Sequence, residues 1–144
     1  MQPFPHQYQV RANAGPDDLV RLSSAGIEDL SSAAPVEFDG PGGHWSPETL
    51  LLGAVADCFV LSFRAVATAS RFSWVELNCE TLGTLDRVDR TTRFTRLTTK
   101  ARLKIGQDAS VERARALLEK AEQVCLISNS LNAERFLEVE VLVE

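Results

Sequence analysis

The feature that most constrains this chain is a long apolar stretch that begins with a strong helix start. Ser46 suits an N-cap, Pro47 suits the first helical position, and Glu48 places an anion where the helix dipole favours one. The sequence predicts a helix from Pro47 to about Ser70. Apolar side chains surround the axis of its first half: Leu50, Leu51, Leu52, Ala54, Val55, Phe59, Val60 and Leu61. A helix without a polar side is buried all round. A small domain can rarely surround so long a helix, so we expect a second copy of the chain to cover it in a homodimer.

Alternating segments before this helix predict a hairpin. Residues 7–12 and 19–22 suit two strands, and the polar run 13–18 between them suits a turn. Residues 23–35 carry only a weak strand signal near Ile27. A Gly-rich loop from Phe38 to Trp45 then leads into the helix.

Two long extended segments are predicted after the helix, at 73–85 and 93–105, joined through 86–92. Alternation in the second segment predicts one face with Leu97, Thr99, Ala101, Leu103 and Ile105, and an opposite, half-exposed face with Thr98, Lys100, Arg102 and Lys104. Ser110 caps a second helix with an apolar stripe that runs from Val111 to Cys125. Ser128 or Asn129 begins one further helical turn, and alternation over 137–143 predicts a closing strand. This order predicts an α+β fold in a single domain over 1–144.

Composition excludes several classes of protein. Apolar residues make up 44% of the 144 residues and charged residues 24%, as in an ordinary globular chain. The net charge of −5 disfavours nucleic-acid binding. The most apolar stretch, from Leu50 to Phe63, is interrupted by Asp57 and looks too short to cross a bilayer, so we expect no membrane association. Three cysteines and an N-terminus unlike a signal peptide predict reduced thiols in a cytoplasmic protein.

Two cysteines lie in distinctive surroundings. Cys58 falls in the apolar helix, and Cys125 falls at the end of the second, amphipathic helix. Buried thiols are most often small hydrophobic residues, and that interpretation stays open here. The alternative is a redox pair that forms and breaks a disulfide. Cys79 shares a strand face with Leu77, and we interpret it as a packing residue.

A thiol that attacks a peroxide must be ionised. The residues near Cys58 in the sequence do not favour ionisation of its thiol. Cys58 is too far along its helix for the N-terminal dipole to act on it. Burial and the neighbouring Asp57 would both raise the pKa of the thiol. Activation therefore requires an arginine or lysine from elsewhere in the fold.

The motifs around both cysteines resemble those of the OsmC/Ohr family. The segment from Pro41 to Phe59 is similar to that family's Gly-rich loop, its (S/N)-P-E helix start and its A-x-C-F segment. The segment from Glu122 to Asn129 resembles its second motif, although Leu126 stands where the family often has proline. The order of elements agrees over essentially the whole chain. The resemblance implies an intertwined homodimer.

By that resemblance Cys58 is the peroxidatic cysteine, Cys125 is the resolving cysteine, and Glu48 orients a catalytic arginine. The implied reaction is reduction of an organic hydroperoxide, with an external dithiol restoring both thiols. Glu48 and Cys58 are about 15 Å apart along a helix, so they can meet only between two antiparallel copies. Complementing the helix dipole is the simpler role for Glu48.

One departure from the family concerns the activating arginine. Family peroxidases carry it in the first β-turn, but residues 13–18 contain two acids and no arginine. Arg11 and Arg21 flank the turn, and we favour Arg21, although both also suit solvated strand positions. The alternative function is therefore non-catalytic binding of a small hydrophobic ligand at the dimer interface. His6 and His44 have no metal-ligand spacing to the cysteines, and we expect no metal or cofactor.

Overall fold

The computed structural model describes residues 1–144, which divide into two compact units, Met1–Leu50 and Leu51–Glu144. The chain contains both helices and sheets, so the predicted α+β class is confirmed. The assignment of the whole chain to one domain stays a prediction. The two units are described in turn.

The N-terminal unit contains a three-stranded antiparallel sheet. Its strands are β1 (Arg11–Asn13), β2 (Val20–Ser24) and β3 (Ile27–Ser32), in the order β1-β2-β3. The predicted first strand over 7–12 is wrong in extent, because only its last two residues enter β1. A turn at Gly26, with φ of 80°, connects β2 to β3. Strand β3 lies in the segment 23–35, for which only a weak strand signal was found near Ile27. A short 3₁₀ helix, η1 (Val36–Phe38), follows.

The predicted long helix is confirmed as α1 (Pro47–Ala69), which starts in the N-terminal unit and continues into the second unit. Thr49 N–H donates to Ser46 Oγ at 3.1 Å, and Ser46 N–H donates to Thr49 Oγ1 at 2.9 Å. These reciprocal bonds satisfy backbone donors that a helix start leaves unpaired. One stripe of α1 is buried: Val55, Phe59, Phe63 and Ala67. Leu61, on the opposite side, is 50% exposed, so the C-terminal unit covers only one face of this helix.

The length of α1 corrects one step of the membrane prediction. By length and composition alone it is able to cross a bilayer, with a mean hydropathy of 1.9. The core helix of a globular protein passes the same test, so this is weak evidence. The absence of membrane association stays a prediction.

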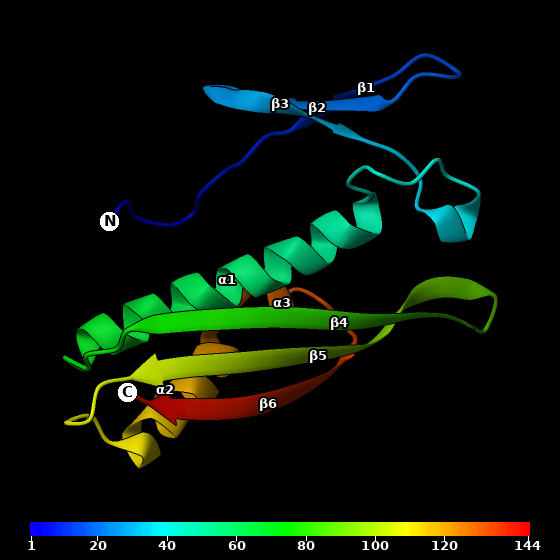
Figure 1. Cartoon of the computed structure of the whole chain (residues 1–144). Coiled ribbons are helices and arrows are strands. Elements are labelled where there is room, and N and C mark those ends of the chain that lie inside the picture. Colours follow the sequence, from blue (N-terminus) through cyan, green and yellow to red (C-terminus); the bar gives the residue numbers. More distant parts are fainter. The chain divides into compact units, whose positions relative to one another are not determined.

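The C-terminal unit contains a second three-stranded sheet (Figure 1). Strands β4 (Glu76–Val88) and β5 (Thr91–Ile105) are antiparallel, and β5 pairs in parallel with β6 (Glu134–Val143). Both predicted extended segments are confirmed, but the expected 86–92 connection is shorter. Its turn is formed by Asp89 and Arg90, at φ of 50° and 67°. Two successive positive φ angles match the twist of a tight hairpin.

The parallel pairing of β5 and β6 requires a crossover, which two helices supply. Helix α2 (Val111–Val124) begins as predicted, with Arg113 N–H donating to Ser110 Oγ at 3.2 Å. The second, α3 (Leu126–Asn129), begins earlier than expected, directly after Cys125. Cys125 is the residue where the chain leaves one helix and enters the next.

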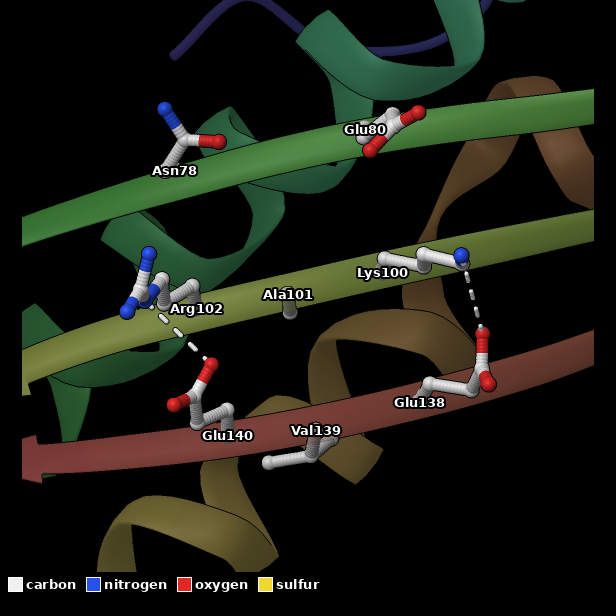
Figure 2. Close-up of a pocket in the computed structure, with 8 residues that line it drawn as sticks. All are labelled: Asn78, Glu80, Lys100, Ala101, Arg102, Glu138, Val139 and Glu140. Carbon is white, nitrogen blue, oxygen red and sulfur yellow. Dashed lines mark ion pairs between the residues drawn. The ribbon is translucent and has the colours of Figure 1, made fainter.

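Alternation along β5 separates a core face from an open face. Leu97, Ala101, Leu103 and Ile105 are buried, and α1 and α2 cover this side through Phe59, Phe63, Ala67, Ala114, Leu118 and Ala121. The open face, seen in Figure 2, carries the charged residues that the sequence placed there. Three cross-strand ion pairs join it: Lys100–Glu138 at 3.9 Å, Arg102–Glu140 at 3.2 Å and Lys104–Glu76 at 3.8 Å. Exposed pairs of this kind contribute at most about 1 kcal/mol each.

Candidate functional site

The fold brings Cys58 and Cys125 together in the C-terminal unit. Cys58 lies in the middle of α1, three residues after Val55 and so on a neighbouring position of the helix surface. The Cys125 thiol donates to the Val55 carbonyl oxygen at 4.0 Å. Cys58 is also close enough to act on the pKa of Cys125. Two thiols far apart in the sequence are therefore neighbours, and both are free.

Burial governs the protonation of Cys125, whose residue is fully buried. Desolvation raises the pKa of the Cys125 thiol above its ordinary value, and the neighbouring Cys58 raises it further. Hydrogen bonds from the Ser128 side chain and backbone oppose this shift. At neutral pH Cys125 is therefore a protonated thiol.

Cys58 is more accessible than Cys125. Its side chain is partly exposed, and its Sγ lies 3.9 Å from the Ser62 hydroxyl oxygen. Neither thiol hydrogen-bonds a lysine or arginine in the C-terminal unit. No hydrogen bond from a cation within this unit therefore activates either thiol.

Cys79 packs against the apolar core, as predicted. Burial raises the pKa of its thiol to about 11, and the charges of Cys125 and Glu122 add to that rise while a Thr81 hydrogen bond opposes it. No pattern in the sequence predicts that Cys79 lies near Cys125. Its raised pKa makes it a poor nucleophile at neutral pH.

Glu48 and Arg21, the other two predicted site residues, belong to the N-terminal unit. One carboxylate oxygen of Glu48, Oε1, is buried without a hydrogen-bond partner. Glu48 lines a cavity of about 440 Å³ whose other walls are mainly apolar, among them Val20, Leu22 and Leu50. The Arg21 guanidinium is exposed and pairs with Asp29 at 3.5 Å. Arg21 therefore has its ion pair with Asp29 instead of Glu48, and the catalytic roles of Arg21 and Glu48 stay predictions.

A cluster of polar side chains beside Cys125 was not predicted from the sequence. Arg135, at the start of β6, donates from Nε to Glu122 Oε1 at 2.8 Å and from Nη1 to Asn129 Oδ1 at 2.7 Å. Glu122 lies in the last turn of α2. Glu122 and Asn129 are the first and last residues of the second cysteine motif, but the motif does not predict their contact with Arg135. Nothing in the sequence near Arg135 connects it with the cysteine.

A hollow of about 360 Å³ lies on the open face of the second sheet, lined by residues including Asn78, Lys100 and Glu138 (Figure 2). The core helices lie behind the strands in this view, so the hollow is on the side of the sheet that the helices do not cover. Its charged residues are largely paired with one another. No group of three or more metal-ligating side chains occurs in the chain.

Solved structures of similar fold include proteins linked to peroxide resistance. An OsmC-like protein of unknown function from Vibrio cholerae matches with a TM-score of 0.86 at 14% identity, over 94% of this chain and 99% of that one. An organic hydroperoxide resistance protein OsmC from Legionella pneumophila, titled a predicted redox protein, matches with a TM-score of 0.74 at 25% identity, over 97% and 99% of the two chains. These matches confirm the predicted OsmC-like fold.

Sequence comparisons agree with the structural ones. The uncharacterized protein YmaD of Bacillus subtilis is 28% identical, over 96% of this chain and 95% of its own. The family model for OsmC-like proteins matches residues 40–140, which include Cys58, Cys79 and Cys125. The chain therefore belongs to the OsmC-like protein family, the OsmC/Ohr family that its cysteine motifs resemble.

Proposed function

We propose that this protein is a thiol-dependent peroxidase that reduces organic hydroperoxides through Cys58 and Cys125. The Cys58 thiolate attacks the outer oxygen of ROOH, the O–O bond breaks, and an alcohol leaves after taking up a proton. Cys58 is then a sulfenic acid. The Cys125 sulfur displaces its hydroxyl group, forming the disulfide and releasing water. An external dithiol reduces that disulfide and becomes oxidised in turn.

The observation that carries this proposal is the pairing of two free thiols, one partly exposed and one fully buried. A sulfenic acid formed at Cys58 would have its resolving partner next to it. We infer an organic hydroperoxide as the substrate. The relatives titled organic hydroperoxide resistance proteins lend support to this substrate class.

Activation of Cys58 is the part of the proposal that depends on the N-terminal unit. We retain Arg21 as the favoured cation and Glu48 as the carboxylate that orients it. A buried carboxylate oxygen without a partner is costly, so Glu48 is suited to receive a guanidinium. We further propose that the protein works as a homodimer, because Leu61, on the side of α1 opposite the buried stripe, is half exposed. We propose the cytoplasm as its location.

The decisive experiment is to treat the reduced protein with one equivalent of cumene hydroperoxide and count the free thiols. We expect two thiols to disappear and peptide mapping to find a Cys58–Cys125 disulfide, with Cys79 still reduced. Cys79→Ser is the matched control and should behave as wild type. Cys125→Ser should stop at a Cys58 sulfenic acid that dimedone traps. Retention of all three thiols would refute the peroxidase proposal.

Arg21→Ala and Glu48→Gln test the activation step. In a Cys79→Ser, Cys125→Ser background, which isolates Cys58, the thiolate absorbance at 240 nm reports the titration of that thiol. If Arg21 acts on Cys58, Arg21→Ala should raise its pKa, and Glu48→Gln should raise it less. If the titration curve of Cys58 is the same in both variants as in the background protein, Arg21 and Glu48 do not belong to the site.

Binding of a small hydrophobic ligand without catalysis is the second candidate. The apolar cavity beside Glu48 favours it, because mainly apolar walls with a single carboxylate are typical of ligand pockets. A hydrophobic probe such as 1-anilinonaphthalene-8-sulfonate distinguishes the two functions. Stoichiometric binding that Leu22→Gln abolishes, together with inert thiols, would favour this candidate.

A further inference from the structure

We infer that Arg135 is a positioning residue that holds Cys125 in place for disulfide formation with Cys58. This inference rests on the proposed reaction at the two thiols. Arg135 is the second residue of β6, where it pairs with Leu97 of β5. It therefore sits on a rigid strand, and its guanidinium reaches the segment that carries Cys125.

Cys125 occupies a break between two helices. It ends α2 and precedes α3, with an extended backbone at φ of −64° and ψ of 102°. Its own N–H makes only a long bond, 3.4 Å, to the Glu122 carbonyl oxygen. The next residue is Leu126, a good helix former that does not by itself stop a helix. The local sequence therefore does not fix this break, and contacts from elsewhere must do so.

Arg135 contacts both sides of the break. On the α2 side, Nε donates to Glu122 Oε1 at 2.8 Å and Nη2 donates to the Glu122 carbonyl oxygen, which the end of the helix leaves short of partners. On the α3 side, Nη1 donates to Asn129 Oδ1 at 2.7 Å. Asn129 in turn donates from Nδ2 to the Gln123 carbonyl oxygen at 3.1 Å. One guanidinium thus joins the two helices around Cys125.

The geometry of the contact requires arginine. A guanidinium presents donors on three nitrogens in a fixed plane, whereas a lysine ammonium is a point charge on one nitrogen. A lysine at this position would keep the ion pair with Glu122 but could not span to Asn129 as well. The pair is largely shielded from water, with side-chain exposures of 27% for Arg135 and 16% for Glu122. Screening by solvent is correspondingly weak.

The consequence concerns the bond between the two sulfurs. Disulfides require closely specified positions of the two cysteines, so a freely moving Cys125 would close the bond less often. In the proposed reaction Cys125 displaces hydroxide from the Cys58 sulfenic acid, and water is released as the S–S bond forms. Arg135 favours that step without touching either sulfur.

The test uses Arg135→Lys, with Arg102→Lys as the matched control because Arg102 forms an exposed ion pair on the open face of the same sheet. Each protein is equilibrated in mixtures of reduced and oxidised dithiothreitol, and the Cys58–Cys125 disulfide is quantified. We expect Arg135→Lys to lower the equilibrium constant for disulfide formation by at least tenfold, a shift of about 30 mV. Asn129→Ala should give a smaller change in the same direction, and Arg102→Lys should match wild type.

A second arm with cumene hydroperoxide separates this inference from the proposed function. Arg135→Lys should leave the loss of the Cys58 thiol as fast as in wild type, while the sulfenic acid trapped by dimedone increases. If peroxide does not react but the dithiothreitol equilibrium still shifts, the peroxidase proposal fails and the role of Arg135 stands. Equilibria within twofold of wild type for both Arg135→Lys and Asn129→Ala would overturn the inference. Absence of the disulfide in wild type would overturn both.

Discussion

The proposed dimer requires that a second copy of the chain covers the exposed side of α1. A substitution at Leu61 tests this requirement. Leu61 lies opposite the buried stripe of this helix and is 50% exposed. Val55 cannot serve for the same test, because it is only 1% exposed within its own chain. An aspartate at Val55 would unfold the protein whether or not a dimer forms. An aspartate at Leu61 leaves that buried stripe intact and places a charge on the side of α1 that we propose a second copy covers.

The size of the effect follows from the exposed half of the leucine. Complete burial of a leucine side chain is worth about 1.5–3 kcal/mol, so burying the remaining half at Leu61 gives about 1 kcal/mol. A two-fold symmetric dimer contains this contact twice. Leu61→Ala should therefore weaken the dimer by about 2 kcal/mol, or about thirtyfold. Leu61→Asp adds the desolvation of two unpaired charges, several kcal/mol each, and should give monomers at micromolar concentration.

Sedimentation velocity over a range of concentrations measures the effect. Leu82→Asp is the matched control, since Leu82 is 44% exposed on β4, in the second sheet. It should remain as dimeric as wild type. A wild-type dimer that Leu61→Asp leaves intact would refute the assignment of this face, and a monomeric wild type would refute the dimer itself.

Three further predictions concern the thiols and the core. The rate of Cys58–Cys125 disulfide formation should rise about tenfold per pH unit from pH 7 to 9, because the raised pKa of Cys125 keeps it mostly protonated there; a rate independent of pH contradicts this. The folded protein should lose stability as pH rises from 9 to about 11, since folding raises the pKa of Cys79 and the native state then holds a proton that the unfolded chain releases. Urea unfolding should show this slope reduced in Cys79→Ser. Phe59→Ala should lower the free energy of unfolding by about 3–5 kcal/mol, because Phe59, on α1, is fully buried in the core. A loss under about 1 kcal/mol would contradict that packing.

The sequence predicted those elements whose signals are local and strong. The caps at Ser46 and Ser110 marked two helix starts to the residue, because a hydroxyl that accepts a backbone N–H acts within one turn. Alternation along β5 assigned the core and open faces correctly. The predicted connection over 86–92 is longer than the observed turn. Asp89 and Arg90 adopt positive φ although neither is a glycine, the residue that usually marks such a turn.

The parts of the candidate site that the sequence missed all depend on tertiary contacts. The proximity of Cys79, on β4, to Cys125 arises from the tertiary fold, and no periodicity encodes it. Arg135 lies in a strand whose pattern says only that one face is apolar. Its partners Glu122 and Asn129 precede it in the sequence and lie on either side of the break between α2 and α3. A side chain that reaches back from a strand to a helix end leaves no spacing rule to recognise.

The unequal surroundings of the two thiols favour one direction for the proposed reaction. A peroxide arrives from solvent, and Cys125 is fully buried while Cys58 is partly exposed. A thiol whose pKa is raised by burial is also mostly protonated at neutral pH, so Cys125 is the poorer choice for the first attack. These two properties suit it for the second step, which takes place inside the protein against a neighbouring sulfur. The burial and the raised pKa of Cys125 therefore support, independently of the motifs, the proposed order in which Cys58 attacks first and Cys125 second.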